Sequence, residues 1–430
     1  MSASINNSGG TSLRKSIVSG VLVVILIVPA KWVAEHFSLY HEVERACYGW
    51  LLGLLAPPYR RNELPIVIVD IRNLEYATKE IQGEKYSITP REELMAVIEA
   101  VMAQEPRVVG LDIDFSPHKI GFVDLGEPLR FRKLKELSEQ RPVRKVPLFL
   151  GIHRSRTLPQ EYWLGNPEFA SLAANVENPD DNRKMFAWTN DGKGQRGLTM
   201  CRALANAFAP ETSGTGGFAS WFVRQVSETQ TDDNRKAGEF LVDFSPLYAL
   251  EDTRLATINP NVIKDQGWTL RDKAVLIGDG TLYAARDSII VPLAGQSKPV
   301  PGIYLHATAA YTLIKSPIYE LTGAARIMLD AVLALIVLAC VTAVGINLRN
   351  SQFSFAQTRT TYVFIFAVTI VVVVLGVVFV NRTRILWSDF VFVIAGLWLH
   401  PVIELFLSPM KRFAKAILGA FRPLVSDEGK

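Results

Sequence analysis

Long apolar runs occur near both ends of the chain and not in the segment between them. One run covers residues 17–34, and three closely spaced runs cover residues 327–348, 361–380 and 385–407. A bilayer core about 30 Å thick requires roughly 20 predominantly apolar residues in a helix. The pattern therefore predicts four transmembrane helices, one N-terminal and three C-terminal, on either side of a folded segment of residues 36–325.

The first run has the flanks of either a signal peptide or an anchor. Arg14 and Lys15 precede the apolar stretch, as they do in both kinds of segment. No small-residue cleavage site follows it, because Lys31, Trp32 and Glu35 suit a cleavage site poorly. We therefore expect an anchor that is not cleaved.

Positive residues beside the apolar runs indicate the orientation, because short positive segments stay in the cytoplasm. Such residues precede the first run, separate the second from the third and follow the fourth, and only Arg382 and Arg384 disagree. The tails, residues 1–16 and 408–430, are therefore expected in the cytoplasm. Residues 36–325 are expected outside, in the periplasm of a bacterium, as part of a multi-pass protein of the inner membrane.

The second tail mixes basic and apolar residues. Amphipathic helices that lie on an anionic leaflet have this pattern. An ordinary solvated end to the last helix has it as well, so both interpretations remain open.

Short apolar runs rich in β-branched residues alternate with helical patterns in the central segment. Residues 66–71 and 108–115 have the composition of strands buried on both faces, which is typical of parallel sheets. Between them, Thr89 suits a helix N-cap, with Pro90 at the first helical position and Glu92 completing a capping box. Strand, helix and strand make a βαβ unit, whose crossover is right-handed.

Further elements follow the same two patterns. Strands are predicted at residues 147–152, 240–244 and 274–278, and helices at residues 36–56, 129–140, 197–208 and 303–314. Loops are expected at residues 175–195 and 212–217. This order predicts an α/β extracytoplasmic domain with a mainly parallel sheet.

The composition agrees with a chain that is part membrane anchor and part folded domain. Hydrophobic residues make up 49% of the chain, and the mean hydropathy is +0.18. The formal net charge of +4 is small and gives no reason to expect nucleic acid as a partner. Cys47 and Cys201 lie in the outer segment, where they either form a disulfide in an oxidising compartment or remain buried thiols.

Aspartates occur at or just after the ends of the predicted strands, namely at Asp70, Asp112, Asp114, Asp279 and Asp287. Ligands bind at the carboxyl edge of open parallel sheets. Carboxylates that converge there hold a divalent cation or act as nucleophile and general acid. The alternative is structural, because aspartates in turns also accept backbone N–H groups or pair with arginine. The sequence leaves a ligand or ion pocket and a structural role both open.

Arg91 and His306 join these aspartates as candidate ligand-binding residues. Arg91 opens the helix after the first strand, and His306 lies in the first turns of the predicted helix at residues 303–314. A lone histidine on a packed helix also serves as an ordinary core residue. No phosphate loop, metal-spaced histidines or nucleophile elbow occurs outside the apolar runs. The sequence therefore assigns no catalytic residue, and it leaves any metal or cofactor unknown.

Several of these segments resemble, in the same order, the CHASE2 family of extracytoplasmic sensory domains in bacterial signalling proteins. The resemblance implies a ligand-sensing domain. It rests on Val69-Asp70, residues 109–115, residues 274–278, Asp287 with Pro292, and Pro301-Gly302 followed by His306-Ala307. Four positions match the family pattern residue by residue: Asp70, Asp112, Asp287 and His306.

The chain departs from the family pattern in two ways. Tyr86-Ser87-Ile88 stands where a Trp-Pro-Trp-like stretch is usual, which leaves Pro90 and Arg91 as matches. Family members also commonly continue into a cyclase, a kinase or another output domain, whereas this chain ends at Lys430, soon after the last apolar run. The expected form is therefore a stand-alone sensor that acts through another protein.

The favoured hypothesis is a membrane-bound sensory or regulatory subunit that is not an enzyme. Its expected partners are the lipid bilayer, an unknown small molecule or ion, a separate protein effector and, as an open alternative, further copies of itself. Two other hypotheses remain. One is a membrane-anchored, metal-dependent hydrolase or phosphatase that uses the aspartates, and the other is a structural subunit of a membrane complex.

Overall fold

The computed structural model divides the chain into two compact units. The large unit is Gly49–Glu320, and the terminal unit combines Met1–Tyr48 with Leu321–Lys430. The described residues are 63–74, 77–81, 84–115, 127–139, 145–152, 171–176, 184–190, 196–209, 222–224, 236–248, 255–265, 269–281, 288–293, 296–322, 324–329 and 354–386, with single residues at 33, 37, 47, 51, 331, 332, 335, 394 and 398.

Six strands form one sheet in the large unit. Their spatial order is β11 (Ala256–Ile258), β1 (Ile66–Asp70), β12 (Ala274–Gly278), β4 (Val108–Asp112), β5 (Leu148–Ile152) and β6 (Ala173–Asn175). Every neighbouring pair runs parallel, so the α/β fold has the parallel sheet that the apolar runs predicted. β12 is the last of the six along the chain but lies between β1 and β4, so the strand order switches at that point.

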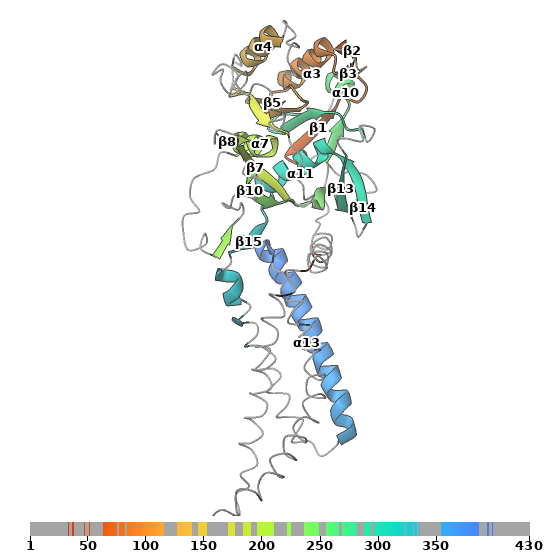
Figure 1. Ribbon diagram of the computed structural model, residues 1–430, viewed down its shortest axis with the longest axis vertical. Helices are drawn as coiled ribbons and strands as arrows, with labels where there is room; N and C mark the ends of the chain where they lie inside the picture. The colour runs from red at the N-terminus through yellow and green to blue at the C-terminus, as the bar shows by residue number, and fades with distance from the viewer. Residues whose placement is uncertain are drawn as a thin grey trace, which may run out of the picture. The chain divides into compact units, whose positions relative to one another are not determined.

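Helices cover both faces of this sheet (Figure 1). One face carries α3 (Arg91–Ala103), α4 (Glu127–Glu139) and α10 (Pro260–Asp265), and the other carries α7 (Met200–Phe208) and α11 (Gly302–Ile314). Successive side chains of a strand point to opposite faces, and both faces of β1 and β12 are fully buried. This double burial explains why these strands appear in the sequence as unbroken apolar runs.

Two glycines allow α7 and α11 to approach the sheet closely. A Cβ at Gly110 of β4 would lie 2.7 Å from Sδ of Met200, the first residue of α7. A Cβ at Gly278 of β12 would lie 2.8 Å from Cδ1 of Ile303 in α11. α11 is buried from Gly302 to Thr312, so the helix forms part of the core and not a surface layer.

A second, antiparallel sheet has the order β10 (Lys236–Leu241), β7 (Lys184–Asn190) and β8 (Arg196–Leu198). β7 occupies part of residues 175–195, so the prediction of a loop throughout that range is wrong. Hairpins join β2 (Ala77–Ile81) to β3 (Glu84–Ile88) and β13 (Ser288–Leu293) to β14 (Gln296–Pro301). The remaining short elements are β9 (Val223–Arg224), α9 (Ser245–Tyr248) and β15 (Tyr319–Leu321).

The start of α3 differs from the predicted capping box. Pro90, not Thr89, is the N-cap, and no side chain caps the helix. Pro90 is extended, with φ −64° and ψ 112°, and its carbonyl oxygen accepts the N–H of Leu94 at 3.0 Å as the first helical hydrogen bond. The extended backbone and this acceptor role are those of an N-cap residue, which places the helix start one residue later than predicted.

The described part of the terminal unit is dominated by α13 (Ser354–Thr383), which is followed by β16 (Ile385–Leu386). The predicted span at residues 361–380 lies within α13. Its described side chains divide between buried positions, such as Ile365 and Val380, and exposed ones, such as Val363. Residues 17–34, 327–348 and 385–407, and the predicted helix at residues 36–56, lie mostly outside the described residues.

Among the described residues, no helix combines the length and the apolar character that crossing a bilayer requires. This finding overturns the four transmembrane helices of the predicted fold class. An apolar run shows that its side chains avoid water. The run alone does not tell whether lipid or protein covers those side chains, and the prediction had no other observation to separate the two.

Candidate functional site

The carboxyl ends of three adjacent strands meet at one edge of the parallel sheet. Asp70 of β1 is level with Gly278 of β12, and Gly278 is level with Asp112 of β4. Neighbouring strands lie about 4.8 Å apart, so the Cα atoms of the two aspartates are separated by about 10 Å. The structure thus places Asp70 and Asp112 at the predicted edge, on opposite sides of the strand where the order switches.

Asp70 is engaged by groups of its own fold. Its Oδ1 accepts the backbone N–H groups of Arg72 and Gly280, each at 3.0 Å, and its Oδ2 accepts Nε–H of Arg72. Nη2 of Arg72 also donates to the carbonyl oxygen of Gly280 at 3.3 Å. The hydrogen bond to Asp70 raises the pKa of Arg72 above its ordinary value, so the guanidinium stays charged. These contacts hold the loop after β12 against the end of β1.

The loop after β12 also fixes Asp279. Its Oδ1 accepts the backbone N–H of Thr281 at 2.8 Å, which is the contact of an Asx turn. Asp279 therefore shapes the loop that Asp70 holds. Asp287, the fifth candidate aspartate, lies outside the described residues.

Asp112 faces His306 across the layer between β4 and α11. Nε2 of His306 lies 3.9 Å from Oδ1 of Asp112 and 3.3 Å from the carbonyl oxygen of Val176, just after β6. The side chain of His306 is 1% exposed and that of Asp112 is 10% exposed. Protonation of His306 would complete an ion pair with Asp112 in this nearly dry position.

The strand predicted at residues 108–115 ends earlier, at Asp112, so Asp114 lies beyond β4 and does not share a strand face with Asp112. The chain turns there, and the N–H of Phe115 donates to the carbonyl oxygen of Gly151 at 2.8 Å. A Cβ at Gly151 would lie 2.5 Å from the carbonyl oxygen of Ile113, so β5 passes very close to this turn. Asp114 remains partly exposed beyond the strand.

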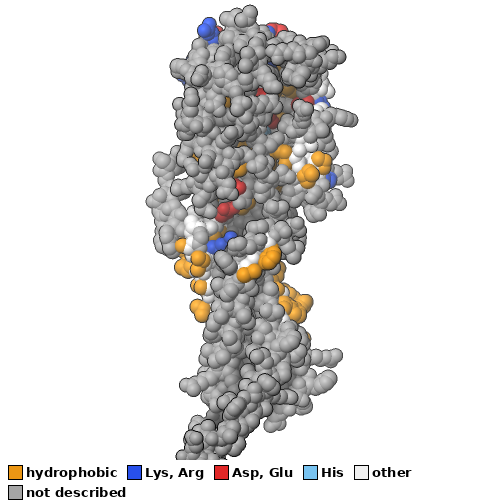
Figure 2. Space-filling view, viewed as in Figure 1, with side chains coloured by type: hydrophobic (Ala, Val, Ile, Leu, Met, Phe, Trp, Pro, Cys, Tyr) orange, Lys and Arg blue, Asp and Glu red, His pale blue; other side chains and the backbone are white. Residues whose placement is uncertain are grey.

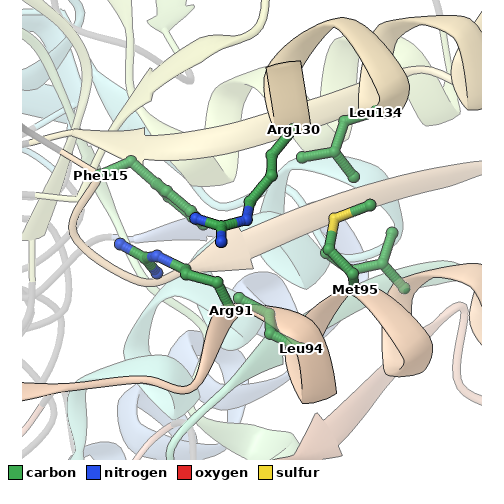
Figure 3. Close-up of a pocket in the computed structure, with 7 residues that line it drawn as sticks. Arg91, Leu94, Met95, Phe115, Arg130 and Leu134 are labelled. Atoms are coloured by element: carbon green, nitrogen blue, oxygen red, sulfur yellow. The ribbon is translucent and has the colours of Figure 1, made fainter. Parts of the chain in front are cut away.

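Arg91 belongs to a pocket on the opposite face of the sheet, between α3 and α4. Its Cζ lies 4.4 Å from the centroid of the Phe115 ring. The pocket is small, because the space it encloses is about 10 Å³, which is room for about one water molecule. It is lined by Arg91, Leu94, Met95, Ile98, Phe115, Arg130 and Leu134, and is called the arginine pocket below (Figure 3).

The sequence did not identify Arg130 or Phe115 as site residues. Arg130 and Leu134 are four residues apart on α4, a spacing that places them on one helix face. That face meets α3 only in the folded structure, across a stretch of the chain that gives no pattern of its own. Figure 2 shows basic and acidic side chains together where Figure 1 places α3 and α4.

The described residues contain no group of three or more histidine, cysteine, aspartate or glutamate side chains that could hold a metal ion. Cys47 and Cys201 are not joined by a disulfide. Cys201 is fully buried at the start of α7, where burial raises the pKa of its thiol to about 11 although a hydrogen bond with Thr199 opposes the shift.

Comparison with known proteins yields one match. The family model described as the CHASE2 domain matches residues 20–346, which is most of the chain. The chain belongs to the CHASE2 domain family, as the resemblance in its sequence predicted. No curated protein and no solved structure matches the chain. Family membership makes this an extracytoplasmic sensory domain of a signalling protein.

Proposed function

We propose that this CHASE2 protein is a sensory subunit at the bacterial inner membrane. Its domain, residues 36–325, lies in the periplasm, binds a small molecule or ion and signals to a separate protein. The family role supports the sensory part of this proposal. Binding at the sheet edge is supported by the alignment of Asp70, Gly278 and Asp112 at the point where the strand order switches, because open parallel sheets bind ligands at such points.

The helix α11 offers a route from the sheet edge to the end of the large unit. His306, near its start, lies beside Asp112 at the carboxyl edge of the sheet. Thr312, near its end, accepts the backbone N–H of Asp243 at 2.8 Å, and the buried carboxylate of Asp243 accepts the hydroxyl of Ser316. Since the helix is buried along most of its length, a displacement at one end is carried to the other.

The signal requires two arrangements of the domain that differ in their affinity for the ligand. A ligand shifts such an equilibrium only by the difference between its two binding free energies. We expect the favoured arrangement to alter the position of residues 315–321, which connect α11 to the terminal unit along the chain. The signal passes to a separate effector protein, which binds this chain at the membrane.

The first experiment measures the melting temperature of the purified full chain against a broad panel of small molecules and ions. A ligand present at 100 times its dissociation constant stabilises the native state by about 2.7 kcal/mol. We expect at least one member of the panel to raise the melting temperature in a concentration-dependent way. If no compound in a chemically broad panel does so, the domain is not a small-ligand sensor.

The second experiment identifies the partner. Affinity purification of the tagged chain from native membranes should retain a signalling protein in a reproducible ratio to the chain. It should also retain an untagged copy of the chain if the chain forms homo-oligomers. The matched control is a chain of the same length with Asp243→Ala, which removes the carboxylate that accepts the hydroxyl of Ser316 just after α11. This variant should still bind the partner, but the ligand should no longer change the activity of that partner.

A further inference from the structure

A histidine lies inside the core of the large unit, in a helix that carries no charged side chain. This residue, His306 of α11, is nearly fully buried, as is Asp112 opposite it. Burial of a group that can carry a charge costs stability unless a partner compensates for it. Histidine is also the only side chain whose charge ordinarily changes between about pH 5 and 8. The fold therefore places a group of this kind beside a carboxylate, where its protonation has the greatest effect.

Two oxygen atoms face Nε2 of His306. The carbonyl oxygen of Val176 lies at 3.3 Å, and Oδ1 of Asp112 lies at 3.9 Å. A carbonyl oxygen only accepts hydrogen bonds, so the neutral ring that suits this position carries its proton on Nε2. The distance to Asp112 is too long for a hydrogen bond. A protonated ring attracts the carboxylate, and since charge-assisted hydrogen bonds measure about 2.7–2.9 Å, the gap should shorten by about 1 Å.

The start of α11 and the end of β4 both pack against Gly278 of β12. A Cβ at Gly278 would lie 2.8 Å from Cδ1 of Ile303 and 3.0 Å from the carbonyl oxygen of Asp112. Close-packed interiors transmit a displacement and do not absorb it. A movement of Asp112 toward His306 therefore changes how the start of α11 sits on the sheet.

The other described elements that pack against α11 carry few groups that titrate. β12 and β13 carry none. The titratable or charged residues on the remaining elements and on α11 itself are Cys201, Arg202, Asp70, Lys298, Tyr304 and Tyr311. Burial raises the pKa of Cys201 to about 11, so this thiol stays neutral. Arginine, lysine, aspartate and tyrosine do not ordinarily change charge between about pH 5 and 8. A response of α11 to pH in that range therefore depends on His306.

We propose that His306 and Asp112 form a proton-dependent switch. Acidification protonates His306, and the resulting ion pair holds the start of α11 to the end of β4. Deprotonation releases the helix. Because α11 is buried along most of its length, its far end, where Thr312 and Ser316 contact Asp243, moves with it. This inference rests on the proposed sensory function and names the proton as an ion to which the domain responds.

The test measures hydrogen exchange by mass spectrometry in the purified full chain at about pH 5 and about pH 8, two values on either side of the ordinary titration of histidine. Each rate is corrected for the intrinsic rate of amide exchange at that pH. We expect the amides of α11 around His306 to exchange about tenfold more slowly at the lower pH, which is the effect of one hydrogen bond to a charged group. Equal corrected rates at the two pH values overturn the proposal.

Variants then test the two residues of the switch. His306→Gln keeps a polar side chain that does not titrate, and Asp112→Asn keeps the size of the carboxylate without its charge. Each should abolish the tenfold difference in exchange. His400→Gln is the matched control, because it removes one histidine from the terminal unit, and it should keep the difference. A difference that persists in the Asp112→Asn chain refutes the ion pair. Should His306→Gln not fold, Asp112→Asn carries the same comparison.

The outcomes separate this inference from the proposed function. The panel of small molecules and ions is measured at one fixed pH, so its result does not depend on the switch. If a compound raises the melting temperature but pH does not change the exchange of α11, the inference fails while the sensory function stands. If neither a compound nor pH acts on the chain, the sensory function fails as well.

Discussion

The contact between Asp70 and Gly280 can be tested by its contribution to the stability of the fold. Asp70→Ala removes the carboxylate that accepts two backbone N–H groups and the side chain of Arg72. Gly280→Ala adds a Cβ that would lie 2.6 Å from Oδ2 of Asp70, so the carboxylate must move away from its present position. The two substitutions act on the same contact from opposite sides, so their effects on stability should not add.

The expected cost of Asp70→Ala follows from the groups that lose their acceptor. Hydrogen bonds to charged groups contribute about 1.5–3 kcal/mol each. The Arg72 side chain is 46% exposed, so water replaces the carboxylate there. The two backbone bonds alone, taken at the lower end of that range, give a loss of about 3 kcal/mol. At about 2–4 °C per kcal/mol for a domain of this size, the melting temperature should fall by about 6–12 °C.

Gly280→Ala in the natural chain should cost about 1–3 kcal/mol, as overpacking does. In the Asp70→Ala chain the nearest clashing atom is absent, so the cost should fall by at least about 1 kcal/mol. Gly110→Ala is the control, because its Cβ meets Met200 of α7 and not Asp70. Its cost should be the same with and without Asp70. Thermal unfolding of the four chains measures the cycle, and additive effects of Asp70→Ala and Gly280→Ala would refute the contact.

Three further predictions follow from the described residues. Because burial raises the pKa of Cys201 to about 11, its thiol should not react with a thiol reagent at pH 8 until the protein unfolds, in a chain whose other two cysteines are serine. Gly238→Ala should destabilise by at least about 2 kcal/mol, because φ is +73° there and a Cβ would lie 2.1 Å from Trp188, and a melting curve measures this. Asn261 is an exposed residue of α10. Asn261→Cys should react with a membrane-impermeant maleimide in cells whose outer membrane is permeabilised, and labelling only after lysis would contradict a periplasmic domain.

The buried parallel strands were predictable because local composition and burial agree there. β1 and β12 are enclosed on both faces, so nearly every residue must be apolar, and the sequence shows this directly. The sequence did not predict β7, because the strand has polar residues at both ends and its neighbouring segments have the composition of loops. Its place depends on pairing with β10, which begins more than forty residues later, and no local pattern encodes such a partner.

The candidate site was predictable in position but not in detail. Strand ends marked the sheet edge, so Asp70 and Asp112 were found there. The sequence could not tell that Asp70 would be engaged by Arg72 and Gly280, because the latter contact spans 210 residues. Arg130 was missed for the same reason, since its role arises only where α4 packs beside α3.

The turn after β4 joins the two faces of the sheet. Asp112, at its start, lies beside His306 of α11, and Phe115, three residues later, lines the arginine pocket on the other face. Removing the guanidinium from the Phe115 ring should therefore be felt at Asp112, which the same turn carries. Arg91→Gln should change the hydrogen-exchange protection of α11 around His306. Arg132→Gln, at an exposed residue of α4 outside the pocket, should leave that protection unchanged. Equal protection of α11 in the two variants would refute a coupling of the two faces through this turn.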